Sequence, residues 1–119
     1  MVEIIAGKKG KGKTKHLLDK VNTAVESATG NIVYLDKSQK HMHELSNKVR
    51  LINVADYPIS NCDEFLGFIC GIVSQDYDLQ EMYLDSFLTI ANLEDDQLVH
   101  TIEKLDIISE KFNVKFVLS

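Results

Sequence analysis

Residues 7–14 read Gly-Lys-Lys-Gly-Lys-Gly-Lys-Thr, and this octet constrains the fold more than any other part of the chain. It fits the pattern G-x-x-x-x-G-K-[ST], which is typical of a tight turn between a strand and a helix. Before it, residues 2–6 form a short apolar run interrupted only by Glu3, as expected of a buried strand. After it, apolar residues recur at helical spacing as far as a stop at Gly30 and Asn31. We therefore predict a strand, a glycine-rich turn and a helix, in that order.

The residue types of the octet suit the binding of a phosphate chain. Glycines let the backbone approach phosphate closely, and successive N–H groups at a helix N-terminus form an anion nest. In such a turn Lys13 would reach the β and γ phosphates of a nucleotide, and the Thr14 hydroxyl would bind Mg²⁺. The residues expected to hold the phosphates are Gly7, Lys8, Lys9, Gly10, Lys11, Gly12, Lys13, Thr14 and Lys15. The alternative is a solvated loop whose lysines serve solubility.

Strand-like and helical segments alternate along the rest of the chain, which predicts a parallel sheet covered by helices. We expect an α/β three-layer sandwich with a mostly parallel sheet of four or five strands and helices on both faces. The later strands are expected at residues 31–36, 49–54, 82–88 and 114–118. Helices are expected from a cap at Ser60 or Asn61 to about Ser74, and over residues 94–112. The inward positions predicted for the last helix are Leu98, Val99, Ile102, Leu105, Ile108 and Phe112.

Length and composition predict one domain with a sizeable core. The chain has 119 residues, of which 45% are hydrophobic, and no stretch reads as a linker, so residues 1–119 are expected to form a single nucleotide-binding domain. The longest uncharged apolar stretch, residues 65–73, is far shorter than the roughly 18 residues that span a bilayer. We expect a cytoplasmic protein without a membrane span. Cys62 and Cys70 match no metal or redox spacing, and we expect both thiols to be buried.

Charge is divided unevenly along the chain. Residues 1–50 hold ten Lys/Arg against five Asp/Glu, a balance of +5, whereas residues 51–119 hold three against thirteen, a balance of −10. Besides the octet, the basic first half contains a second group of residues: Lys37, Lys40, His41, His43, Lys48 and Arg50. This group would either meet nucleic acid or another subunit, or be an ordinary solvated face. We favour the solvated face, and no nucleic-acid partner, because the chain is acidic overall and the group lacks interleaved aromatic residues. His41 and His43 have no metal-ligand partners nearby in the sequence.

A nucleotide held by such a turn needs an Asp at the carboxyl end of a neighbouring strand to orient Mg²⁺. Two residues qualify, since Asp36 follows Tyr-Leu at the end of one apolar run and Asp85 follows Tyr-Leu at the end of another. We favour Asp85, because it closes the third main strand after two helices, and we keep Asp36 as the alternative. Lys13 and Asp85 are then the expected catalytic residues, with Thr14 and Asp85 as the metal ligands.

These motifs together resemble the P-loop NTPase superfamily. The first 36 residues are similar to its opening strand–helix–strand unit, and the whole chain is similar to a reduced version of its fold. In the additional-strand ATPases of this superfamily, the strand after the acidic motif lies between that motif's strand and the P-loop strand, and it ends in a polar sensor. By this resemblance Ser119 would be the sensor. Ser86 departs from the pattern, because it stands where those ATPases usually carry a Glu that activates water.

The resemblance implies Mg·ATP binding with weak or partner-dependent hydrolysis. ATP is favoured over GTP because the guanine-reading pattern Asn-Lys-x-Asp is approached at residues 47–50 but ends in Arg50. Small bacterial chains of this kind resemble proteins labelled as ATP-binding or as relatives of the twitching-motility and secretion ATPases. The acidic and histidine boxes of those motors have no counterpart here, so we do not extend the motor function to this chain.

Two other functions stay open at this point. One is a small-molecule kinase, which would use the same turn to hold ATP. The other is a non-catalytic module in which nucleotide stabilises a homo-oligomer or a protein partner, through the apolar face around Phe65, Phe68 and Ile72.

Overall fold

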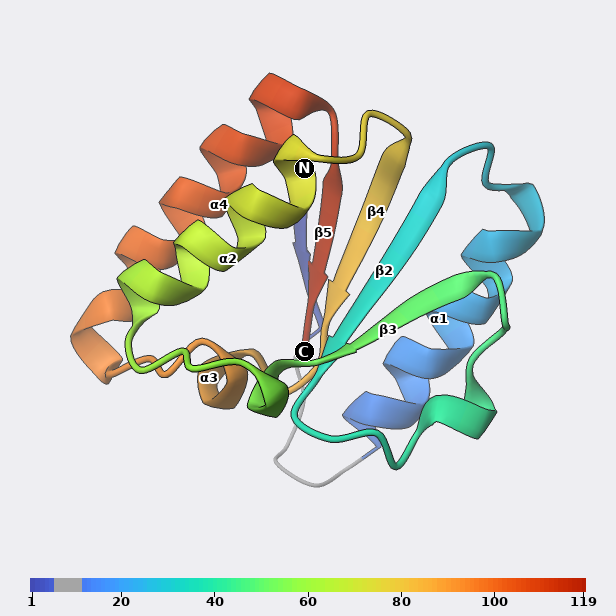
Figure 1. Cartoon of the computed structure of the whole chain (residues 1–119), viewed down its shortest axis with the longest axis horizontal. Helices are drawn as coiled ribbons and strands as arrows, with labels where there is room; N and C mark the ends of the chain where they lie inside the picture. The colour runs from blue at the N-terminus through green and yellow to red at the C-terminus, as the bar shows by residue number, and fades with distance from the viewer. Residues whose placement is uncertain (6–11) are drawn as a thin grey trace.

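The structure, a computed structural model, describes residues 1–5 and 12–119. Within these residues five strands form one sheet in the order β1-β5-β4-β2-β3, and all neighbouring strands are parallel (Figure 1). The strands are β1 (Val2–Ile4), β2 (Asn31–Asp36), β3 (Val49–Asn53), β4 (Leu79–Leu84) and β5 (Lys115–Leu118). The predicted α/β fold with a parallel sheet is confirmed.

Helices cover both faces of the sheet (Figure 1). The α-helices are α1 (Lys13–Ser27), α2 (Cys62–Ser74), α3 (Phe87–Ile90) and α4 (Leu98–Phe112), and short 3₁₀ turns lie at η1 (Met42–Glu44), η2 (Val54–Asp56) and η3 (Asp95–Gln97). One face is covered by α1, and the opposite face is covered by α2 and α4. None of the described helices is both long enough and apolar enough to cross a lipid bilayer.

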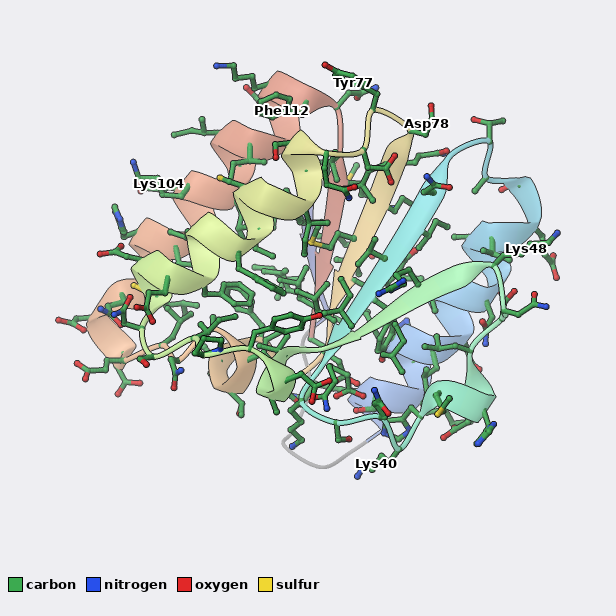
Figure 2. All side chains as sticks on the ribbon, in the orientation of Figure 1. Lys40, Lys48, Tyr77, Asp78, Lys104 and Phe112 are labelled. Carbon is green, nitrogen blue, oxygen red and sulfur yellow. The ribbon has the colours of Figure 1, made fainter. Side chains whose placement is uncertain are left out.

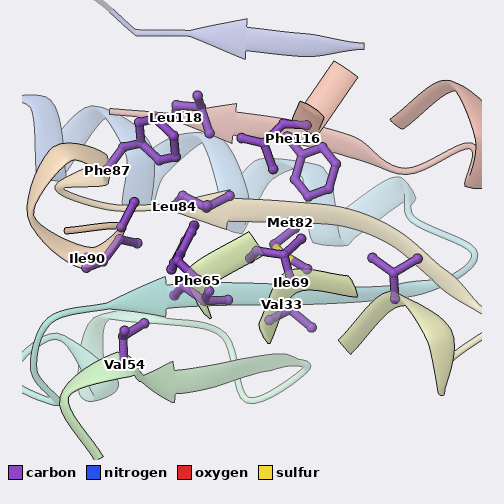
Figure 3. Packing of buried hydrophobic residues seen from close by; sticks show 14 of the residues in the cluster. Val33, Val54, Phe65, Ile69, Met82, Leu84, Phe87, Ile90, Phe116 and Leu118 are labelled. Carbon is purple, nitrogen blue, oxygen red and sulfur yellow. The ribbon is translucent and has the colours of Figure 1, made fainter. Parts of the chain in front are cut away.

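The two cores follow from the alternation of side chains along each strand. On β2, Val33 and Leu35 pack on the side of α2 and α4, whereas Ile32 and Tyr34 pack on the side of α1. The same alternation holds on β4 and β5. Figure 3 shows part of the larger core, in which Phe65 and Ile69 of α2 meet side chains of the sheet. Because both faces are buried, residues 32–35 of β2 and 116–118 of β5 are continuous apolar runs, which is why these two strands could be found in the sequence.

The start of α2 and the end of α4 are both capped. The Asn61 side chain accepts a hydrogen bond from the Glu64 backbone N–H at 2.9 Å, and the Glu64 carboxylate accepts one from the Ser60 N–H at 2.6 Å. This confirms the cap at Asn61 and fixes the start of α2. At the end of α4, Asn113 adopts a left-handed conformation with φ 55°, which ends the helix.

The predicted strand at residues 82–88 is wrong at both ends, because β4 begins at Leu79 and ends at Leu84. Asp85 continues the hydrogen bonding by one residue, and Ser86 then takes a left-handed conformation with φ 56° and turns the chain into α3. The apolar side chain of Phe87 enters the core from this short helix, not from a strand (Figure 3). An apolar run alone does not distinguish these two arrangements.

The predicted inward face of α4 is wrong at two positions. Val99 and Phe112 are 69% and 52% exposed, while Thr101 and Ser109 are buried. Both hydroxyls are satisfied, since Thr101 donates to the Gln97 carbonyl at 2.9 Å and Ser109 accepts from the amino group of Met1. Buried polar groups with partners carry little penalty, so small hydroxyl residues can occupy the face that packs against the sheet.

The outer face of α2 carries two glycines and one of the two cysteines. Its buried side is set by Phe65, Ile69 and Val73, which recur every four residues. Gly67 and Gly71 lie on the other side, where an added Cβ would meet no described atom within 4 Å, so they serve no close approach. Cys62 is buried as predicted, but Cys70 shares the outer side and is exposed.

Candidate functional site

The candidate site lies at the carboxyl edge of the sheet, where the ends of β2, β4 and β5 come together next to the start of α1 (Figure 1). Asp36 is the last residue of β2, Asp85 follows β4 and Ser119 follows β5. The Asp85 N–H donates to the Leu35 carbonyl at 2.9 Å, and the Ser119 N–H donates to the Leu84 carbonyl at 3.0 Å. The sheet hydrogen bonding therefore continues past the strand ends and holds these residues side by side. Ligands of open α/β sheets bind at this edge.

Asp85 is the centre of a hydroxyl network. Its Oδ1 accepts hydrogen bonds from Thr14 Oγ1 at 3.2 Å, Ser119 Oγ at 3.2 Å and Ser86 Oγ at 3.5 Å, and its Oδ2 accepts one from Tyr34 OH at 2.9 Å. The residue is only 2% exposed. These donors come from α1, β2, β5 and the turn after β4, so the charge of one buried carboxylate ties four segments together. The pairing of Thr14 with Asp85 joins the two residues favoured as metal ligands.

Tyr34 was not singled out from the sequence. The side chain is fully buried, and burial together with the neighbouring Asp85 carboxylate raises the pKa of its hydroxyl far above the ordinary value. The hydroxyl therefore stays protonated and keeps donating to Asp85 at any pH the protein meets. The ring lies 6.4 Å from the ring of Tyr83, nearly parallel to it. In the sequence Tyr34 looks like any other aromatic residue of a buried strand. Only the register of β2 with β4 reveals that its hydroxyl lies next to the Asp85 carboxylate.

A cavity of about 820 Å³ opens next to Thr14 and Asp85. Its volume lies within the range of small-molecule sites. It is lined by Gly12, Lys13, Thr14, Lys37, Asp85, Ser86, Phe87, Leu88, Thr89 and Ser119. Two lysines and four hydroxyl groups among these residues suit a negatively charged, oxygen-rich ligand.

The octet is only partly within the described residues. Gly7, Lys8, Lys9, Gly10 and Lys11, five of the residues expected to hold phosphate, lie outside them. Gly12 precedes α1 in a left-handed conformation with φ 77°, and Lys13 begins the helix. This conformation favours glycine, which explains that residue type at the end of the octet. Lys15 differs from its neighbours, because its side chain is 80% exposed and pairs with Asp19 at 3.1 Å on the outer surface of α1.

The alternative metal ligand, Asp36, is also 2% exposed. Its Oδ1 accepts a hydrogen bond from the Lys37 N–H at 2.7 Å, but its Oδ2 is buried and has no hydrogen-bond partner among the described residues. Burial raises the pKa of this carboxyl, and the charge of Asp85 raises it further. A ring nitrogen of His41 and carboxylate oxygens of Asp36 and Asp85 all lie within 4.8 Å of one another.

Sequence reasoning missed the neighbourhood of His41, because the partners of the ring come from strand ends and not from nearby positions in the chain. The second basic group also does not form one compact surface. Lys40 follows the carboxyl end of β2, whereas Lys48 precedes the amino end of β3, and Figure 2 shows the two far apart. Lys37 belongs to the cavity lining instead.

No protein-family model matches this chain, and no curated protein sequence matches it either.

Proposed function

We propose that this protein binds Mg·ATP through its glycine- and lysine-rich turn and hydrolyses it weakly or only with a partner. The observation that carries the proposal is the 3.2 Å hydrogen bond between Thr14 Oγ1 and Asp85 Oδ1, at the wall of a cavity that Lys13 also lines. The octet predicts Lys13 and Thr14 at the phosphates, the end of a neighbouring strand predicts Asp85, and the pairing of Thr14 with Asp85 brings together residues that are 71 positions apart. The preference for ATP over GTP rests on Arg50 in the sequence pattern.

The spacing of the two oxygens suits a magnesium ion. Neighbouring ligands of an octahedral Mg²⁺, with bonds of about 2.1 Å, lie about 3 Å apart. Thr14 Oγ1 and Asp85 Oδ1 at 3.2 Å fit this spacing without rearrangement of the backbone. When bound, Mg²⁺ would neutralise charge on the β and γ phosphates, and Lys13 would add a second positive charge at the same phosphates.

The place of β5 also supports the proposal. The strand lies between β4 and β1, and Ser119 at its end donates to Asp85. The resemblance to the additional-strand ATPases predicts this strand order and a polar residue at this position.

Slow hydrolysis follows from the residues around the cavity. Asp85 is the only carboxylate among the described lining residues, and its oxygens already accept four hydroxyl hydrogen bonds. A general base needs a lone pair directed at the attacking water, and Ser86 supplies none with a suitable pKa. Arg50, the only arginine of the sequence, is exposed on β3 and does not line the cavity. An arginine that stabilises the transition state would therefore come from a partner.

The test is the change in melting temperature on adding Mg·ATP to nucleotide-free protein. A ligand that binds only the folded state stabilises it by about 2.7 kcal/mol at a hundredfold excess over its dissociation constant. We expect this stabilisation in the wild type and its loss in Lys13→Ala. Lys104→Ala is the matched control, because Lys104 is an exposed lysine on α4, away from α1 (Figure 2). Stabilisation that persists in Lys13→Ala, or none in the wild type, would show that the proposal is wrong.

A second measurement separates binding from catalysis. We expect phosphate release by the purified protein to be slower than one turnover per second, below the usual range of enzymes. Several turnovers per second would contradict the argument from the cavity lining.

A further inference from the structure

The Asp36 carboxylate occupies an unfavourable position in the protein without ligand. Its Oδ2 is buried and has no hydrogen-bond partner among residues 1–5 and 12–119, although the residue is 98% shielded from solvent. An unsatisfied buried charged oxygen costs more than a neutral one, and a second carboxylate nearby increases the cost. Asp85 is that second carboxylate, and it already has four hydroxyl donors. Among the described residues, no positively charged group is hydrogen-bonded to Asp36 Oδ2.

The His41 ring is positioned to supply a nitrogen at the same point. Its Nδ1 pairs with Glu44 Oε1 at 2.8 Å, from the position just before η1 to the last residue of η1, and the imidazole side chain is only 19% exposed. This pairing leaves Nε2 as the ring nitrogen available to a ligand. Histidines that bind metals usually donate their other N–H to a carboxylate or carbonyl, which fixes the ring and strengthens the metal bond.

We propose that Asp36, His41 and Asp85 form a binding site for a first-row divalent transition cation, such as Zn²⁺, which binds without nucleotide. Two independent observations carry the inference: the three ligand atoms converge within 4.8 Å of one another, and Asp36 Oδ2 is buried without a partner. The site goes beyond the proposed function, because His41 takes no part in that function and the cation binds without ATP, although the two sites share Asp85.

The three ligands can bind one ion after a movement of their side chains. Zn²⁺ sites in proteins are mostly tetrahedral, and two ligand atoms bonded at about 2.0–2.2 Å then lie about 3.3–3.6 Å apart. A pair of ligand atoms at the observed limit of 4.8 Å would therefore close by about 1.2–1.5 Å when the ion binds. His41 follows the carboxyl end of β2 in a segment without sheet hydrogen bonds, so this side chain can move more easily than the two carboxylates of the strand ends.

The donor set selects the kind of ion. Mg²⁺ and Ca²⁺ prefer oxygen ligands, whereas imidazole nitrogen combined with carboxylate oxygen suits zinc and its first-row neighbours. Because Asp85 already accepts four hydroxyl hydrogen bonds, Asp36 and His41 supply the ligand atoms on which the affinity mainly depends. The remaining positions of the ion would be filled by water.

The test is a calorimetric titration of nucleotide-free protein with ZnCl₂, without chelator. We expect one equivalent to bind to the wild type. Asp36→Asn and His41→Ala should each weaken the dissociation constant by at least tenfold, and Glu44→Gln should weaken it about tenfold, as loss of an orienting carboxylate commonly does. The matched control is His43→Ala, because His43 is an exposed histidine in η1 and should leave the affinity within about twofold of wild type.

Two further measurements keep the outcome clear. Melting curves without zinc check that each variant folds, and Lys13→Ala, which should lose nucleotide binding, should keep zinc binding. Equal zinc affinity in His41→Ala and wild type would overturn the proposal, and so would an equal loss in His43→Ala. Failure of the zinc titration would leave the nucleotide proposal standing, because that proposal is tested with Lys13→Ala and ATP.

Discussion

Replacing Tyr34 by phenylalanine tests whether the hydroxyl network around Asp85 stabilises the fold. The substitution removes one oxygen atom and leaves the stacked ring in place. It deletes the 2.9 Å hydrogen bond to Asp85 Oδ2, where donor and acceptor are both almost fully buried. Water cannot easily take the place of the lost donor, so the carboxylate oxygen is left without its partner.

The magnitude follows from the charge of the acceptor. A hydrogen bond to a charged group contributes about 1.5–3 kcal/mol, more than one between neutral groups. We therefore expect Tyr34→Phe to lower the free energy of unfolding by about 2 kcal/mol. For a domain of this length, unfolding entropies of about 2.1 cal/mol/K per residue convert this loss into a fall in melting temperature of about 8 °C.

The assay is urea unfolding at neutral pH, with Tyr83→Phe as the matched control. Tyr83 is a buried tyrosine that stacks on Tyr34, but its hydroxyl donates to Glu81 Oε1, and Glu81 is partly exposed. Water can replace that donor, so we expect a cost of less than about 1 kcal/mol. If Tyr34→Phe costs no more than Tyr83→Phe, the network does not contribute as described, and our reasoning about Asp85 is wrong.

Three other substitutions test the electrostatics and the capping. Asp36→Asn should stabilise the metal-free protein at pH 7. Burial raises the pKa of Asp36 in the folded state, so the extra stability of the variant should shrink as the pH falls through that pKa toward the unfolded value. Urea unfolding of both proteins from pH 7 to pH 4 would show this change. A stability difference that does not depend on pH would contradict it. Glu3→Gln should cost about 0.5–1 kcal/mol at pH 7, because the partly exposed carboxylate bridges Lys20 at 3.0 Å and Lys115 at 3.2 Å. The hydrogen bond to Lys20 is the main cause that lowers the pKa of Glu3, so the cost should shrink as the pH falls through this lowered folded-state pKa, and a cost that stays constant from pH 7 to pH 3 would argue for another cause. Asn61→Ala should cost about 1 kcal/mol by removing the cap of α2, measured as the denaturation midpoint, and an unchanged midpoint would show that the cap is not needed.

The parts of the fold that local chemistry determines could be predicted from the sequence. The second strand was predicted at the residues where it lies, because a strand that is buried on both faces is recognised as an unbroken apolar run in the sequence. The cap at Asn61 was found because its side-chain oxygen accepts a hydrogen bond from the N–H of a residue only three positions later in the sequence. The expected closeness of Thr14 and Asp85 follows from parallel topology, which brings strand ends to one edge.

The missed features depend on long-range packing. The end of β4 is set by the left-handed turn at Ser86, a residue type that seldom adopts this conformation. The exposure of Val99 depends on how α4 rotates against the sheet, and helical spacing alone does not determine that rotation. His41 meets Asp36 and Asp85 because the chain bends back after β2, and no sequence spacing encodes this path.

The order of strands in the sheet has a consequence for how the chain folds during its synthesis. Because β1 lies at one edge, its single neighbour in the sheet is β5, and Val2 pairs with Phe116. At a translation rate of roughly 5–20 residues per second, the first strand waits roughly 6–23 s for its partner. Closing so long a loop is slow, since its entropy cost must be met before the new contacts form. The residues of β1 therefore stay without their partner strand for seconds during synthesis, and the sheet is completed only when β5 has been made.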